Sequence, residues 1–170
     1  MERLPYKDYT IKAKAKDHSV TEKILLKSGA RYAGLDKQTD TYFQCDRGKL
    51  KLRQGILENL ITHYERLDEK GIERTIVYRY DLNPTQDQIT ELFNLYAVAG
   101  MVKKERKIFY LGNTKIHLDT LPDGQNFIEI EAIDRTDRVD ISFLKQQCLN
   151  VKELLDLRDE DLLKTGYFFP

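Results

Sequence analysis

Charged residues stand at every second position in several short segments of the chain. In residues 48–55, Lys51 and Arg53 alternate with Leu50 and Leu52. The same two-residue period recurs in three later segments, which are residues 102–111, 114–121 and 126–132. Because successive side chains of a β-strand point to opposite faces, each segment predicts a strand with one charged and one apolar face. Charged faces on successive strands either meet solvent or line the inside of a closed barrel.

The number of predicted strands is compatible with such a barrel. They span residues 6–16, 38–45, 48–55, 57–68, 72–82, 101–111, 114–121 and 125–133. About eight mostly antiparallel strands can close on themselves, which removes exposed strand edges and leaves room for side chains or one small ligand. The sequence therefore predicts an α+β protein with an eight-stranded antiparallel β-barrel and flanking helices, in a single domain over residues 1–170.

Three helical regions accompany these strands. The first is predicted over residues 20–28, with Ser19 as its N-cap and Gly29 at its end. A second helix begins at Asn83-Pro84. Its apolar stripe, which we assign to the core, consists of Ile89, Leu92, Phe93 and Tyr96. The C-terminal region is predicted to be helical over residues 142–150 and 151–164.

Composition narrows the class of protein. The 170 residues include 28 basic and 28 acidic side chains, and a net charge of zero argues against a general nucleic-acid binder. Cys45 and Cys148 match no zinc or redox spacing. No apolar run is long enough to span a bilayer and no signal peptide is evident, so we expect a cytoplasmic protein without membrane or nucleic-acid partners.

The ordered motifs resemble a known family. Three stretches carry the likeness: DTYFQCDRGKLKLRQG, LITHYERLDEKG and TKIHLDTLPDGQNFIEIEA. Together they are similar to the CYTH domain, named after class IV adenylate cyclase and thiamine triphosphatase and also called the triphosphate tunnel metalloenzyme family. The resemblance implies a tunnel in which basic side chains bind a triphosphate and glutamates hold Mg²⁺ or Mn²⁺. Clustered Lys and Arg suit a polyanion, and carboxylates suit a hard cation, so the chemistry agrees.

The resemblance also implies particular site residues. The predicted triphosphate-binding residues are Lys12, Lys51, Arg53, Arg66, Lys104 and Arg106. The predicted metal ligands are Glu129, Glu131, Asp119 and Asp8. His63 and His117 are assigned as hydrogen-bonded sheet residues, although His117 shares the face of Asp119. Tyr64 and Tyr167 are candidates to border the substrate, and Glu58, Glu65 and Glu69 are assigned to the surface.

The first strand departs from the family pattern. The family begins with Glu-x-Glu-x-Lys, and the best alignment here is Asp8, Thr10 and Lys12. The alternative register, Lys12-x-Lys14-x-Lys16, puts lysine in both glutamate positions. In either register the carboxylates expected to hold metal are reduced to one or none, which predicts weak, altered or absent catalysis.

Three functions follow from the resemblance. The first is metal-dependent hydrolysis of tripolyphosphate, a nucleoside triphosphate or thiamine triphosphate. The second is an adenylate cyclase that makes cyclic AMP and pyrophosphate from ATP. The third is a catalytically degenerate module that binds polyphosphate or an organic phosphate. The expected partner is a small-molecule triphosphate or polyphosphate, and the chain is expected to be a monomer or a homodimer.

Overall fold

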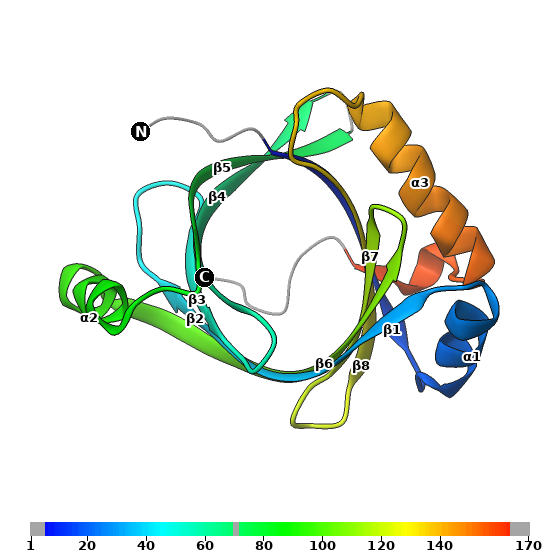
Figure 1. Cartoon of the computed structure of the whole chain (residues 1–170), viewed down its shortest axis with the longest axis horizontal. Coiled ribbons are helices and arrows are strands. Elements are labelled where there is room, and N and C mark those ends of the chain that lie inside the picture. Colours follow the sequence, from blue (N-terminus) through cyan, green and yellow to red (C-terminus); the bar gives the residue numbers. More distant parts are fainter. Residues whose placement is uncertain (1–5, 70–71, 164–170) are drawn as a thin grey trace.

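A computed structural model describes residues 6–69 and 72–163 (Figure 1). The elements follow the order β1 (Lys7–Ala15), α1 (Ser19–Lys27), β2 (Arg31–Phe43), β3 (Lys49–Gln54), β4 (Asn59–Glu69), β5 (Ile72–Leu82), α2 (Gln86–Leu95), β6 (Val98–Leu111), β7 (Thr114–Thr120), β8 (Asn126–Asp134), α3 (Ile141–Leu154), the short 3-10 helix η1 (Asp159–Asp161) and β9 (Leu162–Leu163). None of the helices in the described residues has the length and apolar character that crossing a bilayer requires.

The strands form one curled antiparallel sheet that encircles a central space (Figure 1). Its order is β5-β4-β3-β2-β6-β7-β8-β1-β9. The edge strand β5 comes round to lie against β1. Within the described residues these two strands share no backbone ladder, and Asp8 of β1 and Thr75 of β5 line the same cavity. The predicted fold class and barrel-like antiparallel sheet are confirmed, with nine strands in the described part of the chain in place of the predicted eight.

The apolar core lies outside the curled sheet, between its outer face and the helices. One cluster joins the outward side chains of β1, β7 and β8 to α1 and α3, and it includes Ile11, Ile116 and Ile130 with Leu25 and Leu144. Alternation along each strand turns the neighbouring charged residues inward. The helices cover the apolar outer face of the sheet, so the polar side chains lie on its inner face.

A smaller cluster lies under α2. Leu52 and Ile61 from the sheet pack with Leu92 of α2 and are almost completely buried. The predicted stripe of this helix is only partly core, since Phe93 and Tyr96 are exposed. Ile89 packs at the margin of the cluster, and the exposed Phe93 ring still meets the edge of Phe43 at a centroid distance of 5.1 Å.

The helix ends correct three predictions. His18, not Ser19, is the N-cap of α1. Thr85 caps α2 through a reciprocal capping box with Gln88, so the predicted start at Asn83-Pro84 was two residues early. The C-terminal helix ends at Leu154, because Asp156 adopts a positive φ of 53° and Leu157 N–H bonds back to the carbonyl of Lys152. The continuation predicted to residue 164 is instead η1 and β9, up to residue 163.

Candidate functional site

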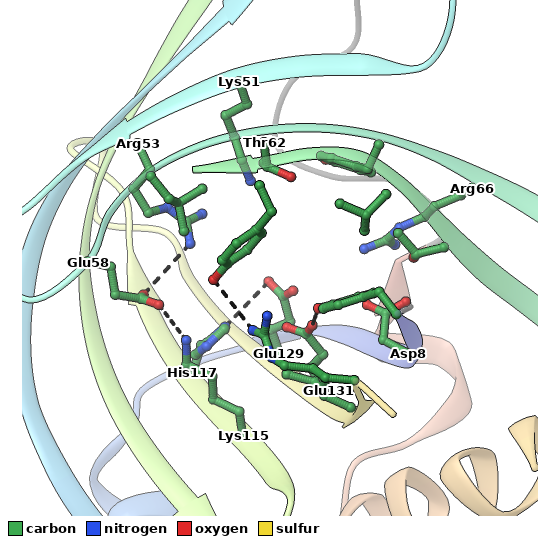
Figure 2. Close-up of a pocket in the computed structure, with 18 of the residues that line it drawn as sticks. Asp8, Lys51, Arg53, Glu58, Thr62, Arg66, Lys115, His117, Glu129 and Glu131 are labelled. Atoms are coloured by element: carbon green, nitrogen blue, oxygen red, sulfur yellow. Dashed lines mark hydrogen bonds and ion pairs between the residues drawn. The ribbon is translucent and has the colours of Figure 1, made fainter. Parts of the chain in front are cut away.

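A cavity inside the curled sheet gathers charged side chains from all parts of the chain (Figure 2). Its basic lining consists of Lys51, Arg53, Arg66, Arg106, Lys115 and Arg135. Its acidic lining consists of Asp8, Glu58, Glu129 and Glu131. The remaining polar lining includes Tyr6, Thr62, Tyr64, Thr75, Tyr80 and His117. Cationic side chains outnumber carboxylates in this list, which suits an anionic ligand.

The predicted triphosphate-binding residues divide into two groups. Lys51, Arg53, Arg66 and Arg106 line the cavity. Lys12 and Lys104 do not belong to its described lining. The Lys12 ammonium lies 3.2 Å from a Glu129 carboxylate oxygen, and Lys104 donates to Asp40 at 2.7 Å.

Asp40, which the sequence analysis did not single out, organises one side of the cavity. It stands directly opposite Arg53 in the β2–β3 register and accepts two hydrogen bonds from that guanidinium, both 2.8 Å long. Burial opposes its ionisation, yet Arg53 and Lys104 hold the pKa of Asp40 well below its usual value. A bidentate carboxylate fixes the plane of a guanidinium, so Asp40 orients Arg53 toward the cavity.

The second arginine is held in the same way. Arg106 faces Asp119 across the β6–β7 ladder and donates two hydrogen bonds of 2.7 Å to it. A further bond of 3.3 Å joins Arg106 to Glu129. Asp119, a predicted metal ligand, is fully buried and does not belong to the described cavity lining. Its observed contact is with Arg106, which it orients.

Lys51 is half-buried and differs from the buried cations Arg53, Lys104 and Arg106. Among the described residues it has no hydrogen-bond or ion-pair partner, and its ammonium lies 5.9 Å and 5.5 Å from the ring centroids of Tyr42 and Tyr64. Burial and the neighbouring Arg53 lower the pKa of Lys51 well below its usual value. An ammonium that contacts aromatic rings and forms no ion pair among the described residues can bind an anion.

Asp8 and Glu131 form an acidic pair at the seam between β1 and β8. Burial and the carboxylate of Glu131 raise the pKa of Asp8. Tyr6 donates to Glu131 at 2.7 Å, and Thr10 donates to Asp8 at 3.3 Å. Two adjacent carboxylates repel each other unless a proton or a cation lies between them. This pair therefore fits a divalent cation.

Asp8 and Glu131 suit a metal ion that takes only one or two of its ligands from the protein. Within residues 6–69 and 72–163, no three acidic, histidine or cysteine side chains converge on one point. Glu129 is the other predicted metal ligand in the cavity, and its carboxylate forms ion pairs with Lys12 and Arg106. Mg²⁺ commonly uses one or two carboxylates with substrate phosphates and water completing its shell, so Asp8 and Glu131 would hold such an ion together with a bound triphosphate.

The first strand lies in the predicted orientation. Asp8 lines the cavity, while Thr10 and Lys12 pair across the ladder with Glu131 and Glu129. Lys14, on the same face, is exposed, as is Lys16 just beyond the strand. The structure thus brings the Asp8-x-Thr10-x-Lys12 set to the acidic strand β8.

Glu58 was assigned to the surface, and the structure corrects this. Its carboxylate lies in the cavity against the Lys115 ammonium and 3.7 Å from Arg53 Nη1. The loop that carries it is fastened by Asp36, which accepts the backbone N–H groups of residues 56, 57 and 58 at 2.6–3.0 Å. A Cβ atom on residue 55 would lie 2.6 Å from the Asp36 carboxylate. The close approach of the loop to Asp36 therefore requires glycine at this position.

The two histidines behave differently. His63 contacts the backbone carbonyl of Arg47 through Nε2 at 2.7 Å, as expected for a hydrogen-bonded sheet residue. His117 does not: neither ring nitrogen has a hydrogen-bond partner among the described residues, and Nδ1 lies 3.9 Å from Glu129. Burial and the Arg106 guanidinium lower the pKa of His117 to about 4, so the ring is neutral at pH 7.

Other lining residues were missed by the site predictions. Lys115 follows the two-residue period with His117, and that period could have identified it. Arg135 follows β8 and carries no such signal. Its guanidinium lies over the rings of Tyr6 and Tyr80, 5.2 Å and 4.9 Å from their centroids. Tyr64 lines the cavity as proposed, and Tyr167 lies outside the described residues.

Comparison with known proteins now assigns the family. The sequence model of the CYTH domain matches residues 8–167, nearly the whole chain. The chain therefore belongs to the CYTH domain family. This family includes triphosphatases and adenylate cyclases, so membership supports triphosphate binding or hydrolysis in general. A search of curated protein sequences found no match.

Several solved structures share the fold. The PH1012 protein of Pyrococcus horikoshii OT3 is 24% identical, with a TM-score of 0.78 over 94% of this chain and 96% of that chain. A conserved hypothetical protein of Pyrococcus furiosus is 22% identical, with a TM-score of 0.75 over 94% and 97%. A "putative adenylate cyclase" of Vibrio parahaemolyticus is 18% identical, with a TM-score of 0.74 over 95% of each chain. At these identities the likeness shows a common fold.

Proposed function

We propose that the protein binds a triphosphate-containing small molecule in the cavity and hydrolyses it with the help of Mg²⁺ or Mn²⁺. The observation that carries the proposal is Lys51, a half-buried ammonium that forms no ion pair among the described residues and shares the cavity with the fixed guanidinium groups of Arg53 and Arg106. Three cations that converge in a buried space strongly favour a polyanion between them.

The chain's own residues divide the work of binding. Arg53 and Arg106 are held by Asp40 and Asp119, so their remaining N–H groups are oriented before the ligand arrives. Lys51 provides an ammonium group that forms no ion pair with a carboxylate among the described residues. A divalent ion bound with the phosphates would neutralise negative charge as it develops during phosphoryl transfer, and Asp8 and Glu131 are the residues proposed to hold it.

Substitution of Lys51 by methionine tests the anion site. We expect the dissociation constant of tripolyphosphate, measured by calorimetry, to rise about 10- to 100-fold, because one charge-assisted contact is lost. The ligand-free protein should not lose stability, since the change removes a half-buried charge that forms no ion pair among the described residues. Lys23→Met is the control, because Lys23 is exposed on helix α1, outside the described lining of this cavity. Equal affinity in wild type and Lys51→Met would contradict the proposal.

Substitution of Asp8 by asparagine tests the metal assignment. We expect the extra affinity for tripolyphosphate that Mg²⁺ or Mn²⁺ provides to fall about 10- to 100-fold, a range known even for groups that only support metal ligands. Metal-free binding should be kept or improved, because a negative charge leaves the cavity. Asp123→Asn, in the exposed β7–β8 turn, serves as the control. Unchanged metal dependence in Asp8→Asn would exclude Asp8 as a ligand.

A binding-only role is the second candidate, and it is favoured by one observation. No three-acid cluster exists among the described residues, so the cavity could hold a polyphosphate without the metal that chemistry needs. Product analysis separates the alternatives. Release of inorganic phosphate from a triphosphate supports hydrolysis, and cyclic AMP with pyrophosphate from ATP supports cyclase activity. Tight metal-independent binding without turnover supports the binding module.

A further inference from the structure

One wall of the cavity is poorly suited to phosphate. Glu58 lies against Lys115 and close to Arg53, so its carboxylate offsets part of the positive charge there. Figure 2 shows Glu58 and His117 on the side of the cavity opposite Asp8 and Arg66. A phosphate group at this wall would meet a fixed negative charge. The basic cluster around Lys51 and the wall around Glu58, where a carboxylate offsets the charge of Lys115, therefore favour different chemical groups.

The position of Glu58 is fixed by the loop before β4. Asp36, which is fully buried, accepts three backbone N–H groups of this loop. Gln38 donates from one amide nitrogen to Asp36 and to Glu58, both at 2.8 Å. This network holds the Glu58 carboxylate at the wall. The carboxylate is consequently a stable hydrogen-bond acceptor inside the cavity.

His117 supplies an independent sign that a ligand group belongs here. Its side chain is 2% exposed and lines the cavity, and both ring nitrogens lack hydrogen-bond partners among the described residues. Buried polar atoms are nearly always paired, and an exception in a binding cavity indicates a missing partner. A neutral imidazole offers one donor and one acceptor. It is therefore matched by a group that can both accept and donate.

We propose that Glu58 and His117 form a subsite for the non-phosphate part of an organic triphosphate. The group it takes bears hydroxyl or amino donors, as the sugar and base of a nucleoside triphosphate do. Glu58 accepts from such a donor, and His117 exchanges a hydrogen bond with the same moiety. This inference rests on the proposed function, and it assigns the phosphate chain to the Lys51 side of the cavity.

The test compares nucleotides with tripolyphosphate, which has no organic part. Dissociation constants of tripolyphosphate, ATP, GTP, CTP and UTP are measured by calorimetry at one Mg²⁺ concentration. For His117→Leu we expect the affinity for at least one nucleotide, relative to tripolyphosphate, to fall about tenfold. His117→Gln, which keeps a donor and an acceptor, should recover part of this preference. His63→Leu, outside the described lining, should retain the wild-type ratio.

Glu58→Gln provides a second measurement, because it should change the affinity for tripolyphosphate and the relative affinity for the nucleotide in opposite directions. Removal of its charge should strengthen tripolyphosphate binding and weaken the relative affinity for the same nucleotide. Equal effects of His117→Leu and Glu58→Gln on all five ligands would overturn the subsite. Wild-type binding of tripolyphosphate without binding of any nucleotide would also overturn it, while leaving the proposed triphosphate site intact. Failure of all five ligands to bind would instead contradict the proposed function itself.

Discussion

Replacement of Arg106 by alanine is expected to lower the free energy of unfolding by about 3–5 kcal/mol. The reason is Asp119, which is 0% exposed and receives both of its short guanidinium bonds from Arg106. Without that partner, Asp119 is left as a buried charge. The measurement is urea denaturation at pH 7 with linear extrapolation to water.

Two further variants identify the cause. Arg158→Ala removes a surface arginine paired with Glu160 and Asp161, and its expected cost is below about 1 kcal/mol. The double variant Arg106→Met with Asp119→Leu should regain much of the loss, because it removes both charges together. A cost for Arg106→Ala no larger than that of Arg158→Ala would show that Asp119 does not depend on this pair.

The second large effect is a fall in stability between pH 6.5 and pH 4 that arises from His117. Burial and Arg106 lower its pKa in the folded protein to about 4, against 6.5 for an ordinary histidine. In this interval the unfolded chain binds more protons than the folded one, so acid favours unfolding. The contribution is complete above pH 6.5 and lost as the pH approaches 4. A shift of this size corresponds to about 3 kcal/mol.

His117→Leu isolates this contribution. The difference in unfolding free energy between wild type and His117→Leu should change by about 3 kcal/mol in favour of the variant as the pH falls from 7 to 4. Asp8, whose pKa is raised by burial and Glu131, has the opposite pH dependence, but it is common to both proteins and cancels in the difference. Measurements in the presence of EDTA keep metal binding out of the comparison. Parallel pH profiles would show that His117 titrates normally.

The period of the strands explains how much of the fold the sequence could predict. Lys51 and Arg53 alternate with Leu50 and Leu52, and the structure places the leucines in the core under α2 and the cations in the cavity. Such alternation is a local pattern, so it can be recognised in a single sequence. The end of α3 was predicted incorrectly, because the positive φ of Asp156 is not encoded by any glycine at that position.

The candidate site was predictable where it follows strand periodicity. The sequence determined that the basic residues of β3 share one face of that strand, as do those of β6 and the glutamates of β8, and the family resemblance indicated their chemistry. It could not determine which carboxylate each cation meets. Asp40 opposite Arg53, and Asp119 opposite Arg106, depend on the register between strands, which the pairing of whole strands sets.

Only the tertiary structure placed Glu58 and Arg135 in the cavity and left both nitrogens of His117 without hydrogen-bond partners among the described residues. Glu58 lies in a loop, where no two-residue period indicates direction, and it turns inward because Asp36 of another strand binds that loop's backbone. Periodicity tells which face of a strand a residue occupies. The curling of the sheet decides which faces meet, because it is set by long-range contacts that no short segment contains.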